Sequence, residues 1–217
     1  MTTATQKKII PEVMDLKPIV LIPEKAPAKI SHIKSEDGFF LNTLVSDDFR
    51  IREPVYNMLK EATKKLPAGC HFMIFEAYRP LKKQESLWHQ TYSTLEKKYP
   101  DLNKEQMQLL CENFVANPYD GIGSGHQAAC ALDLTLCDAA GVEFDMGTKM
   151  QEMNEKTKTL SPDVTQSQMK NRLTLKNALE NVGFVNYPAE WWHFSYGDHQ
   201  WAYLLGRKDA FFGPIDI

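Results

Sequence analysis

The sequence predicts an α+β fold, built as one compact domain in which helices flank an antiparallel sheet. Its 217 residues suit a single domain. Segments with helical spacing of apolar residues do not alternate regularly with the short apolar runs that are typical of strands. This segregation of helices and strands is typical of α+β proteins, whereas regular alternation would indicate a parallel α/β sheet.

The first 35 residues predict an irregular N-terminal arm that packs on the body of the domain, residues 36–217. One short strand is expected in the arm, at residues 19–22. The rest of the arm is interrupted by prolines, which break regular structure. These prolines are Pro11, Pro18, Pro23 and Pro27.

The next segments predict a strand at residues 39–45 and a helix over residues 55–66, where apolar residues recur at helical spacing. The apolar run at residues 70–75 predicts a buried strand. Two further helices are expected at residues 81–99 and 104–115. Asn103 and Gln106 fit a capping box at the start of the second of these helices. Residues 117–125 contain three glycines and predict a loop.

The C-terminal half predicts four strands and one helix. The helix is expected over residues 166–182, because Gly183 is a suitable residue for a helix C-terminus. The aromatic tail that follows, from His199 onward, is expected to pack on the body. The four strands are expected at residues 131–137, 142–144, 184–186 and 191–196.

Composition and charge exclude some classes of partner. Lys and Arg number 25, and Asp and Glu number 28. The chain therefore lacks the excess of basic residues that would indicate binding to nucleic acid or to an anionic membrane surface. The start of the chain lacks the apolar core of a signal peptide and no transmembrane segment is visible, so a cytoplasmic location is expected. The four cysteines form no Cys-x-x-Cys pair, and free, mostly buried thiols are expected.

A histidine and an aspartate are candidates for sharing one metal ion. His126 leaves a glycine-rich loop, and Asp133 lies seven residues later inside an apolar strand. Side chains alternate along a strand, so this odd separation requires a bend, which Ala128 and Ala129 would permit. A buried carboxylate is costly unless it is paired or bound to a metal. The alternative is a solvent-facing aspartate on a half-exposed strand.

The stretch Glu190-Trp191-Trp192-His193 adds an imidazole and a carboxylate. A hydrolytic zinc site needs three protein ligands, an open position and a nearby carboxylate base. Two histidines and Asp133 would supply the ligands, and Glu190 the base. The alternative is an aromatic core cluster that includes a histidine.

Arg79 follows a buried strand and precedes Pro80, which restricts its backbone. Its guanidinium is suited to an oxyanion or a substrate carboxylate. A structural ion pair with Glu76 or Asp133 is equally compatible with the sequence. Cys130 and Cys137 flank Asp133, and a thiolate ligand from either would indicate a closed, structural metal site instead.

Taken together, these stretches resemble the D-alanyl-D-alanine dipeptidases of the VanX type, which belong to the zinc D,D-peptidases. That group has the pattern Ser-x-His-x-x-Gly-x-Ala-x-Asp followed by Glu-x-x-His. Arg79 matches the arginine of the dipeptidases' Tyr-Arg-Pro segment. The residues that match the two patterns are Ser124, His126, Ala131, Asp133, Glu190 and His193.

The resemblance implies one Zn²⁺ held by His126, Asp133 and His193, in the α+β fold of D,D-peptidases and Hedgehog-like zinc domains. It implies that Glu190 acts as general base and then general acid, and that Arg79 stabilises the tetrahedral intermediate. The expected substrate is a small free dipeptide, with D-Ala-D-Ala foremost. Ser124, beside a ligand, is a candidate for binding the substrate carboxylate, although its hydroxyl could equally satisfy backbone groups.

Two departures from the family pattern matter. Ala129 stands where the pattern has glycine, so a positive φ angle there would be strained. The first 65 residues match poorly, so pocket walls from that region do not transfer. Two alternatives remain: a zinc D,D-carboxypeptidase or endopeptidase acting on peptidoglycan peptides, and a non-catalytic zinc-binding interaction domain. Retention of Glu190 and Arg79 argues against the second.

Overall fold

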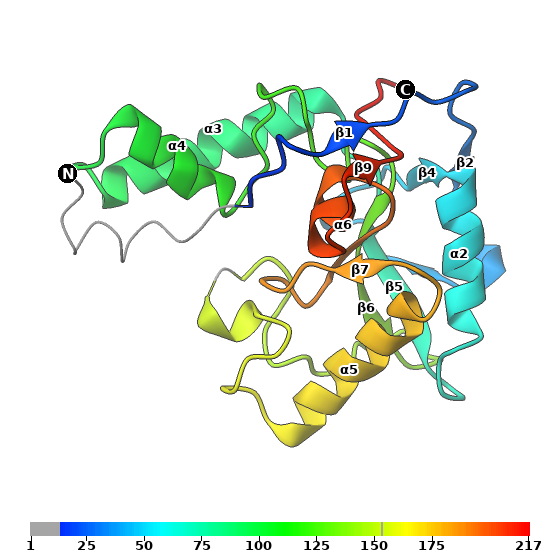
Figure 1. The fold of residues 1–217 in the computed structure, drawn as a ribbon. Coiled ribbons are helices and arrows are strands. Elements are labelled where there is room, and N and C mark those ends of the chain that lie inside the picture. Colours follow the sequence, from blue (N-terminus) through cyan, green and yellow to red (C-terminus); the bar gives the residue numbers. More distant parts are fainter. Residues whose placement is uncertain (1–13, 153) are drawn as a thin grey trace.

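The computed structural model describes residues 14–152 and 154–217, and at its centre lies a five-stranded sheet (Figure 1). All neighbouring strands in this sheet are antiparallel except β3 and β5, which are parallel. The predicted α+β class is confirmed, with a sheet that is mixed at one edge. In spatial order the strands are β3 (Phe40–Leu41), β5 (His71–Glu76), β6 (Ala131–Cys137), β8 (His193–Ser195) and β7 (Val185–Asn186).

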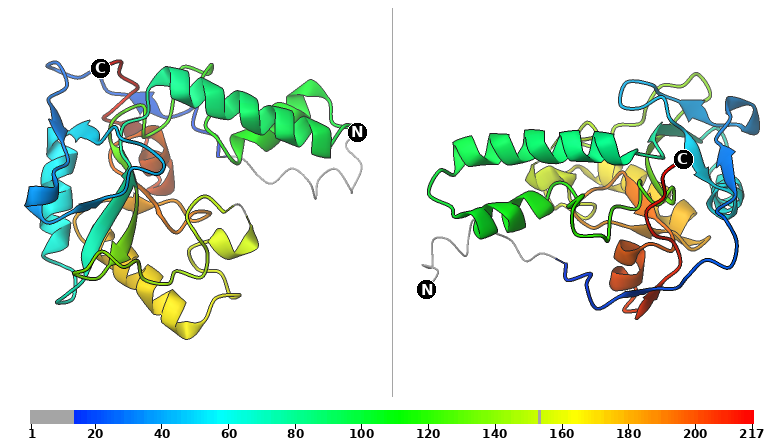
Figure 2. Two further views of the ribbon diagram at one scale, coloured as in Figure 1. Left: turned by 180° about the vertical axis from the view of Figure 1, so that it is seen from behind. Right: turned by 90° about the horizontal axis from the view of Figure 1, so that it is seen from above.

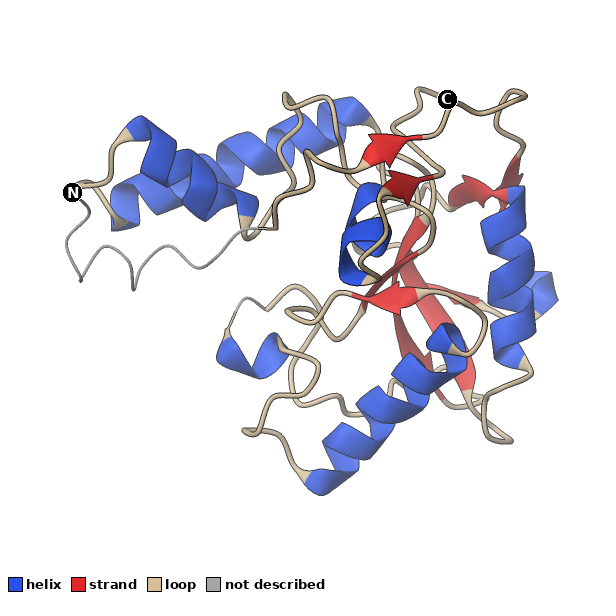
Figure 3. Ribbon diagram, viewed as in Figure 1, coloured by secondary structure: helices blue, strands red, loops and turns tan. Residues whose placement is uncertain are grey.

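Two helices, α2 (Glu53–Thr63) and α5 (Gln166–Glu180), cover one face of this sheet (Figure 3). Leu59 from α2 and Leu179 from α5 are fully buried in the main core beside strand residues such as Leu134. Both helices were predicted, the first from its apolar spacing and the second from its closing glycine, and both are confirmed. Burial of each such leucine contributes about 2 kcal/mol, so this face accounts for much of the stability of the domain.

The opposite face of the sheet carries the polar side chains. On β6, Leu132 and Leu134 belong to the main core, so the alternation of a strand turns Asp133 toward the other face. On β8, Phe194 belongs to the core in the same way, and His193 is turned away from it. Antiparallel pairing sets Asp133 directly opposite His193. Two candidate metal ligands therefore meet through strand register alone.

The helical hairpin of α3 (Leu81–Lys98) and α4 (Lys104–Glu112) projects away from the sheet (Figure 2). It has a small apolar core of its own, in which Trp88 of α3 packs with Leu110 of α4. The predicted capping box is present: Asn103 accepts a hydrogen bond from the Gln106 backbone at 2.9 Å, and the Gln106 side chain accepts one from the Asn103 backbone at 3.1 Å.

Residues 14–35 pair with distant parts of the chain, and residues 1–13 of the predicted arm lie outside the described residues. β1 (Val20–Leu21) runs parallel to β9 (Asp209–Ala210), and β2 (Ile30–His32) runs antiparallel to β4 (Arg50–Arg52). The division of the chain after residue 35 stays a prediction. Two 3₁₀ turns, η1 (Ser35–Asp37) and η2 (Glu155–Thr157), complete the connections.

Several sequence predictions differ from the structure in detail. The strand expected at residues 39–45 is reduced to β3, and residues 142–144 form no strand but a single bridge between Glu143 and Cys137. The tail contains a helix that was not predicted, α6 (His199–Leu204), whose N-cap is Asp198. No helix among the described residues is long and apolar enough to cross a membrane.

The bend expected between His126 and Asp133 is present. The amide groups of Cys130 and Ala131 both donate to the carbonyl of Gly125, at 3.0 and 3.1 Å, and this turn places His126 before the strand begins. Ala129 has a φ of 52° within the turn, so the position where the family pattern has glycine does require a left-handed backbone. An L-residue in this conformation costs about 1 kcal/mol.

Replacing Gly125 with alanine should destabilise the protein strongly. A Cβ atom at this position would overlap Oδ2 of the buried Asp198 and lie 2.8 Å from the Cβ of Ala131. We expect Gly125→Ala to lower the free energy of unfolding by about 3 kcal/mol, as overpacking in a buried site does. Urea denaturation of the metal-free protein measures this loss.

Gly121→Ala is the matched control, because Gly121 lies in the same loop with a φ of 78°, and a Cβ atom there would meet nothing within 4 Å. Only backbone strain should then apply, with a loss of about 1 kcal/mol. Equal losses in the two variants would contradict the steric account.

Candidate metal centre and catalytic site

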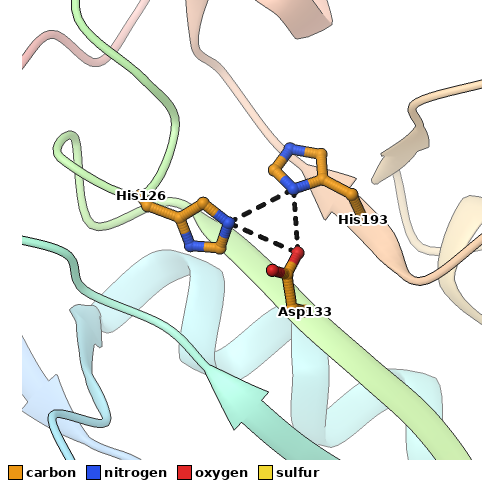
Figure 4. Close-up of side chains that lie close together, drawn as sticks. All are labelled: His126, Asp133 and His193. Carbon is orange, nitrogen blue, oxygen red and sulfur yellow. Dashed lines mark hydrogen bonds and ion pairs between the residues drawn. The ribbon is translucent and has the colours of Figure 1, made fainter. Parts of the chain in front are cut away.

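Three buried side chains converge at one point on the polar face of the sheet. His126 Nε2 lies 3.2 Å from His193 Nδ1 and 3.3 Å from Asp133 Oδ1, and His193 Nδ1 lies 2.9 Å from Asp133 Oδ1 (Figure 4). Within residues 14–152 and 154–217, this is the one group of three or more His, Cys, Asp or Glu residues that could hold a metal ion. The three residues predicted as ligands are therefore brought together.

The burial of Asp133 excludes one of the alternatives left open by the sequence. Every residue of β6 is buried, and Asp133 itself is only 3% exposed, so it is not a solvent-facing aspartate on a half-exposed strand. Burial opposes ionisation, but the charges and hydrogen bonds of His126 and His193 hold the pKa of Asp133 well below its usual value. The carboxylate is thus kept in the form that binds a cation.

A contact of the ring of His126 determines which of its two nitrogens carries the hydrogen. Nδ1 lies 2.7 Å from the carbonyl oxygen of Ala77, which can only accept, so Nδ1 carries the hydrogen. Nε2 then directs a lone pair at the point where His193 and Asp133 also direct theirs. A cation bound at this point would replace the hydrogens that the imidazoles otherwise share with Asp133, and two imidazoles with one carboxylate form a ligand set suited to zinc.

Cys130 does not join this group. Its thiol is fully buried, and burial raises the pKa of the thiol well above its usual value. The thiol form is a poor metal ligand. Because Cys130 and Cys137 both lie outside the cluster of possible ligands, the structural-site alternative that used a thiolate loses its basis.

Glu190 lies in the turn before β8 and lines the same cavity as Asp133 and His193. Burial raises the pKa of Glu190 to about 7, with Asp133 adding to the rise and the charges of His193 and Arg79 opposing it. A carboxylate with a pKa near neutrality can both take up and release a proton under ordinary conditions. The predicted base therefore lies in the cavity with a pKa suited to acid–base chemistry.

Arg79 lines this cavity too, and its guanidinium is fixed by two neighbours. Nη2 forms an ion pair with the buried Glu76, and Nη1 donates to Gln84 Oε1 at 2.9 Å. Lys83 also contacts Glu76, at 2.8 Å. Of the two ion pairs considered from the sequence, the one with Glu76 is present. The Nε atom of Arg79 is buried and finds no hydrogen-bond partner in the part of the chain that the structure describes.

The support of Arg79 by Gln84 was not predicted. Gln84 is fully buried in the first turn of α3, and its amide also donates to the carbonyl of Ala116 at 2.7 Å. The sequence carried no signal for this role, because glutamine is ordinary in a helix and its burial follows only from the fold. Gln84 links the arginine to the helical hairpin.

Ser124 lies on the cavity wall together with the other predicted site residues. Its hydroxyl accepts a hydrogen bond from the Gln127 backbone at 3.2 Å. The hydroxyl therefore satisfies a backbone group, which was the alternative to a contact with the substrate carboxylate. The cavity has a volume of about 1140 Å³ and extends from the three ligands along the helical hairpin, past Leu109 and Phe114.

Comparison with known proteins identifies the family. A family profile described as D-ala-D-ala dipeptidase matches residues 49–211. The D-alanyl-D-alanine dipeptidase of Escherichia coli (strain K12) is 33% identical over 127 residues, which cover 58% of this chain and 55% of that protein. The D-alanyl-D-alanine dipeptidase of Synechocystis sp. is 26% identical over an alignment covering 93% of this chain and 98% of that protein.

Among solved structures, VanYB in complex with D-alanine-D-alanine has a TM-score of 0.50 at 16% identity, covering 89% of this chain and 94% of that one. This similarity concerns the fold, and it agrees with the arrangement of sheet and helices described above. The family match extends through the strands that carry Asp133 and His193. The chain therefore belongs to the D-Ala-D-Ala dipeptidase family of peptidases.

Proposed function

We propose that this protein is a zinc-dependent dipeptidase that hydrolyses a free dipeptide, with D-Ala-D-Ala as the substrate. The observation that carries the proposal is the convergence of His126, Asp133 and His193 beside Glu190 in one cavity. The names of the related proteins from Escherichia coli and Synechocystis support the choice of dipeptide. We propose one zinc ion per chain.

In this proposal, His126 Nε2, Asp133 Oδ1 and His193 Nδ1 hold the metal. Bound zinc supplies a Lewis acid that lowers the pKa of a water toward ~7 and polarises the substrate carbonyl. Glu190 takes a proton from the attacking water and later gives it to the leaving amine. Its raised pKa suits both steps, because the same group must be a base first and an acid afterward.

Arg79 stabilises the negative charge that develops on the oxygen of the scissile carbonyl. Its contacts with Glu76 and Gln84 keep the guanidinium in one orientation, so little reorganisation is needed during the reaction. Ser124, adjacent to the loop that holds His126, is proposed to contact the substrate carboxylate.

One observation favours a second candidate, a zinc D,D-carboxypeptidase. The cavity volume of about 1140 Å³ exceeds what a dipeptide of two alanines would fill, and the excess lies along the helical hairpin. A longer peptide could extend into this part of the cavity. The non-catalytic alternative is disfavoured, since a structural zinc site requires neither Glu190 nor Arg79 at the cavity wall.

Loss of one ligand should remove the metal. We expect the purified protein to bind about one equivalent of zinc, and His193→Ala to retain little after gel filtration, because two remaining ligands bind zinc weakly. Elemental analysis of protein and metal gives the ratio. His89→Ala, which changes an exposed histidine, is the control and should keep its zinc. Equal zinc contents in all three proteins would contradict the ligand assignment.

Loss of the base should abolish turnover but leave the metal in place. Glu190→Gln preserves the shape of the side chain and removes its proton acceptor, so kcat should fall by ~10²–10⁴. The assay compares D-Ala-D-Ala with L-Ala-L-Ala and with N-acetyl-D-Ala-D-Ala. Cleavage of the free D,D-dipeptide alone supports the proposal, whereas cleavage of the acetylated peptide would indicate the carboxypeptidase. Full activity of Glu190→Gln would refute its role as the base.

The pH profile should show the raised pKa of Glu190. The base must be deprotonated to act, so kcat/KM should fall as the pH drops through the pKa of this group. Burial raises that pKa from 4.5 to about 7, and the charge of a bound metal lowers it again, so the acid limb is expected between these values. A limb at or below pH 4.5 would show that burial does not control this carboxyl group.

A further inference from the structure

Asp198 lies beside the metal-binding histidines but has no part in the chemistry proposed above. Its side chain is buried, with 3% of its surface exposed. Oδ1 accepts hydrogen bonds from Ser195 Oγ at 3.0 Å and from the Trp201 backbone at 2.7 Å. Oδ2 is buried and has no hydrogen-bond partner among residues 14–152 and 154–217. A buried carboxylate oxygen without a donor is costly and calls for an explanation.

Strand geometry places Asp198 on the same side of the sheet as His193. Ser195 lies two residues after His193 on β8, so the two side chains project from the same face. Because Ser195 donates to Asp198, the carboxylate is held on that face as well. Burial has the largest effect on the pKa of both groups, and each also shifts the pKa of the other through its charge.

Asp198 also packs against the loop that holds His126. Its Oδ2 atom lies so close to the backbone of Gly125 that a Cβ atom there would overlap it. Gly125 directly precedes His126 in the sequence. One carboxylate thus contacts both the strand and the loop that carry the two histidines.

One ring nitrogen of His193 is free to donate a hydrogen bond toward Asp198. Nδ1 faces His126 and Asp133, and the second nitrogen, Nε2, faces away from both (Figure 4). When Nδ1 binds a metal, Nε2 must carry the hydrogen of the neutral ring. Histidine ligands almost always donate this hydrogen to a carboxylate, a carbonyl or a water.

We propose that Asp198 is a positioning residue of the metal site, whose Oδ2 accepts the Nε2 hydrogen of His193 through one bridging water in the cavity that both residues line. This contact fixes the imidazole with Nδ1 directed at the metal. The inference rests on the proposed zinc site. The competing explanation is that Asp198 serves only as the N-cap of α6, a role that uses Oδ1 alone.

Asp198→Asn separates the two roles. Asparagine caps a helix as well as aspartate does, and its oxygen can keep both bonds now made by Oδ1. Its NH₂ group replaces Oδ2 and donates instead of accepting, so it cannot receive a hydrogen from a water that bridges to His193. We expect zinc affinity to fall ~10–100-fold, as with other losses of a partner to a metal ligand. The unfolding midpoint of the metal-free protein in urea should change little.

Competition with a chromogenic chelator measures the zinc affinity, and the visible spectrum of the Co²⁺ form reports ligand geometry. Asp120→Asn is the control, because Asp120 also lines the cavity but is exposed, and its oxygen accepts from the Ile122 and Gly123 backbones as an asparagine oxygen would. It removes the same charge from the same cavity. Its zinc affinity and Co²⁺ spectrum should match those of the unaltered protein.

Wild-type affinity and an unchanged Co²⁺ spectrum in Asp198→Asn would overturn the inference and leave the zinc site intact. Failure of the unaltered protein to bind zinc would instead refute the metal site of the proposed function. If Asp198→Asn does not fold, Ser195→Ala provides the test, since it releases one restraint on Asp198 without altering Oδ2. A zinc affinity reduced on the order of threefold is expected there. An unchanged affinity would count against the positioning role.

Discussion

The antiparallel pairing of β6 with β8 is the constraint on which the rest of the site depends. It sets Asp133 opposite His193 while Leu132 and Phe194 pack into the core on the other face. A shift of one residue in this register would turn His193 into the core and Phe194 into the cavity. Because the core would then bury an imidazole without a partner, the apolar packing under the sheet enforces the geometry of the ligands above it.

Two buried acids lie next to each other across the sheet, and each has its own set of cationic or hydrogen-bonding partners. Glu76 on β5 pairs in register with Asp133 on β6. Burial alone would favour the neutral form of Glu76, but the charge of Arg79 and its hydrogen bond keep the pKa of Glu76 below its usual value. The histidines do the same for Asp133. Because each carboxylate has its own partners, both Glu76 and Asp133 stay ionised. Glu76 therefore holds Arg79 at the cavity, and Arg79 does not take Asp133 away from the metal.

Patterns along the chain predicted the long elements and the convergence of the ligands, because both depend on local spacing or on motifs. Short strands such as β2, β4 and β9 were missed, because the pairing of such strands joins segments far apart in sequence. The same limit applies to Gln84 and Asp198. Their types are ordinary for a helix and a turn, and only the fold shows that each is buried beside a functional group.

Beyond the first turn of α3, where Lys83 and Gln84 contact Glu76 and Arg79, the helical hairpin packs mainly on itself. Its apolar core, including Trp88, Leu95 and Met107, shares no residue with the core beneath the sheet, and α3 and α4 contact each other more than any other element. Segments of this kind open as cooperative units at a lower free energy than global unfolding. The wall that borders the far end of the cavity can therefore open while β6, in the middle of the sheet, keeps its pairing.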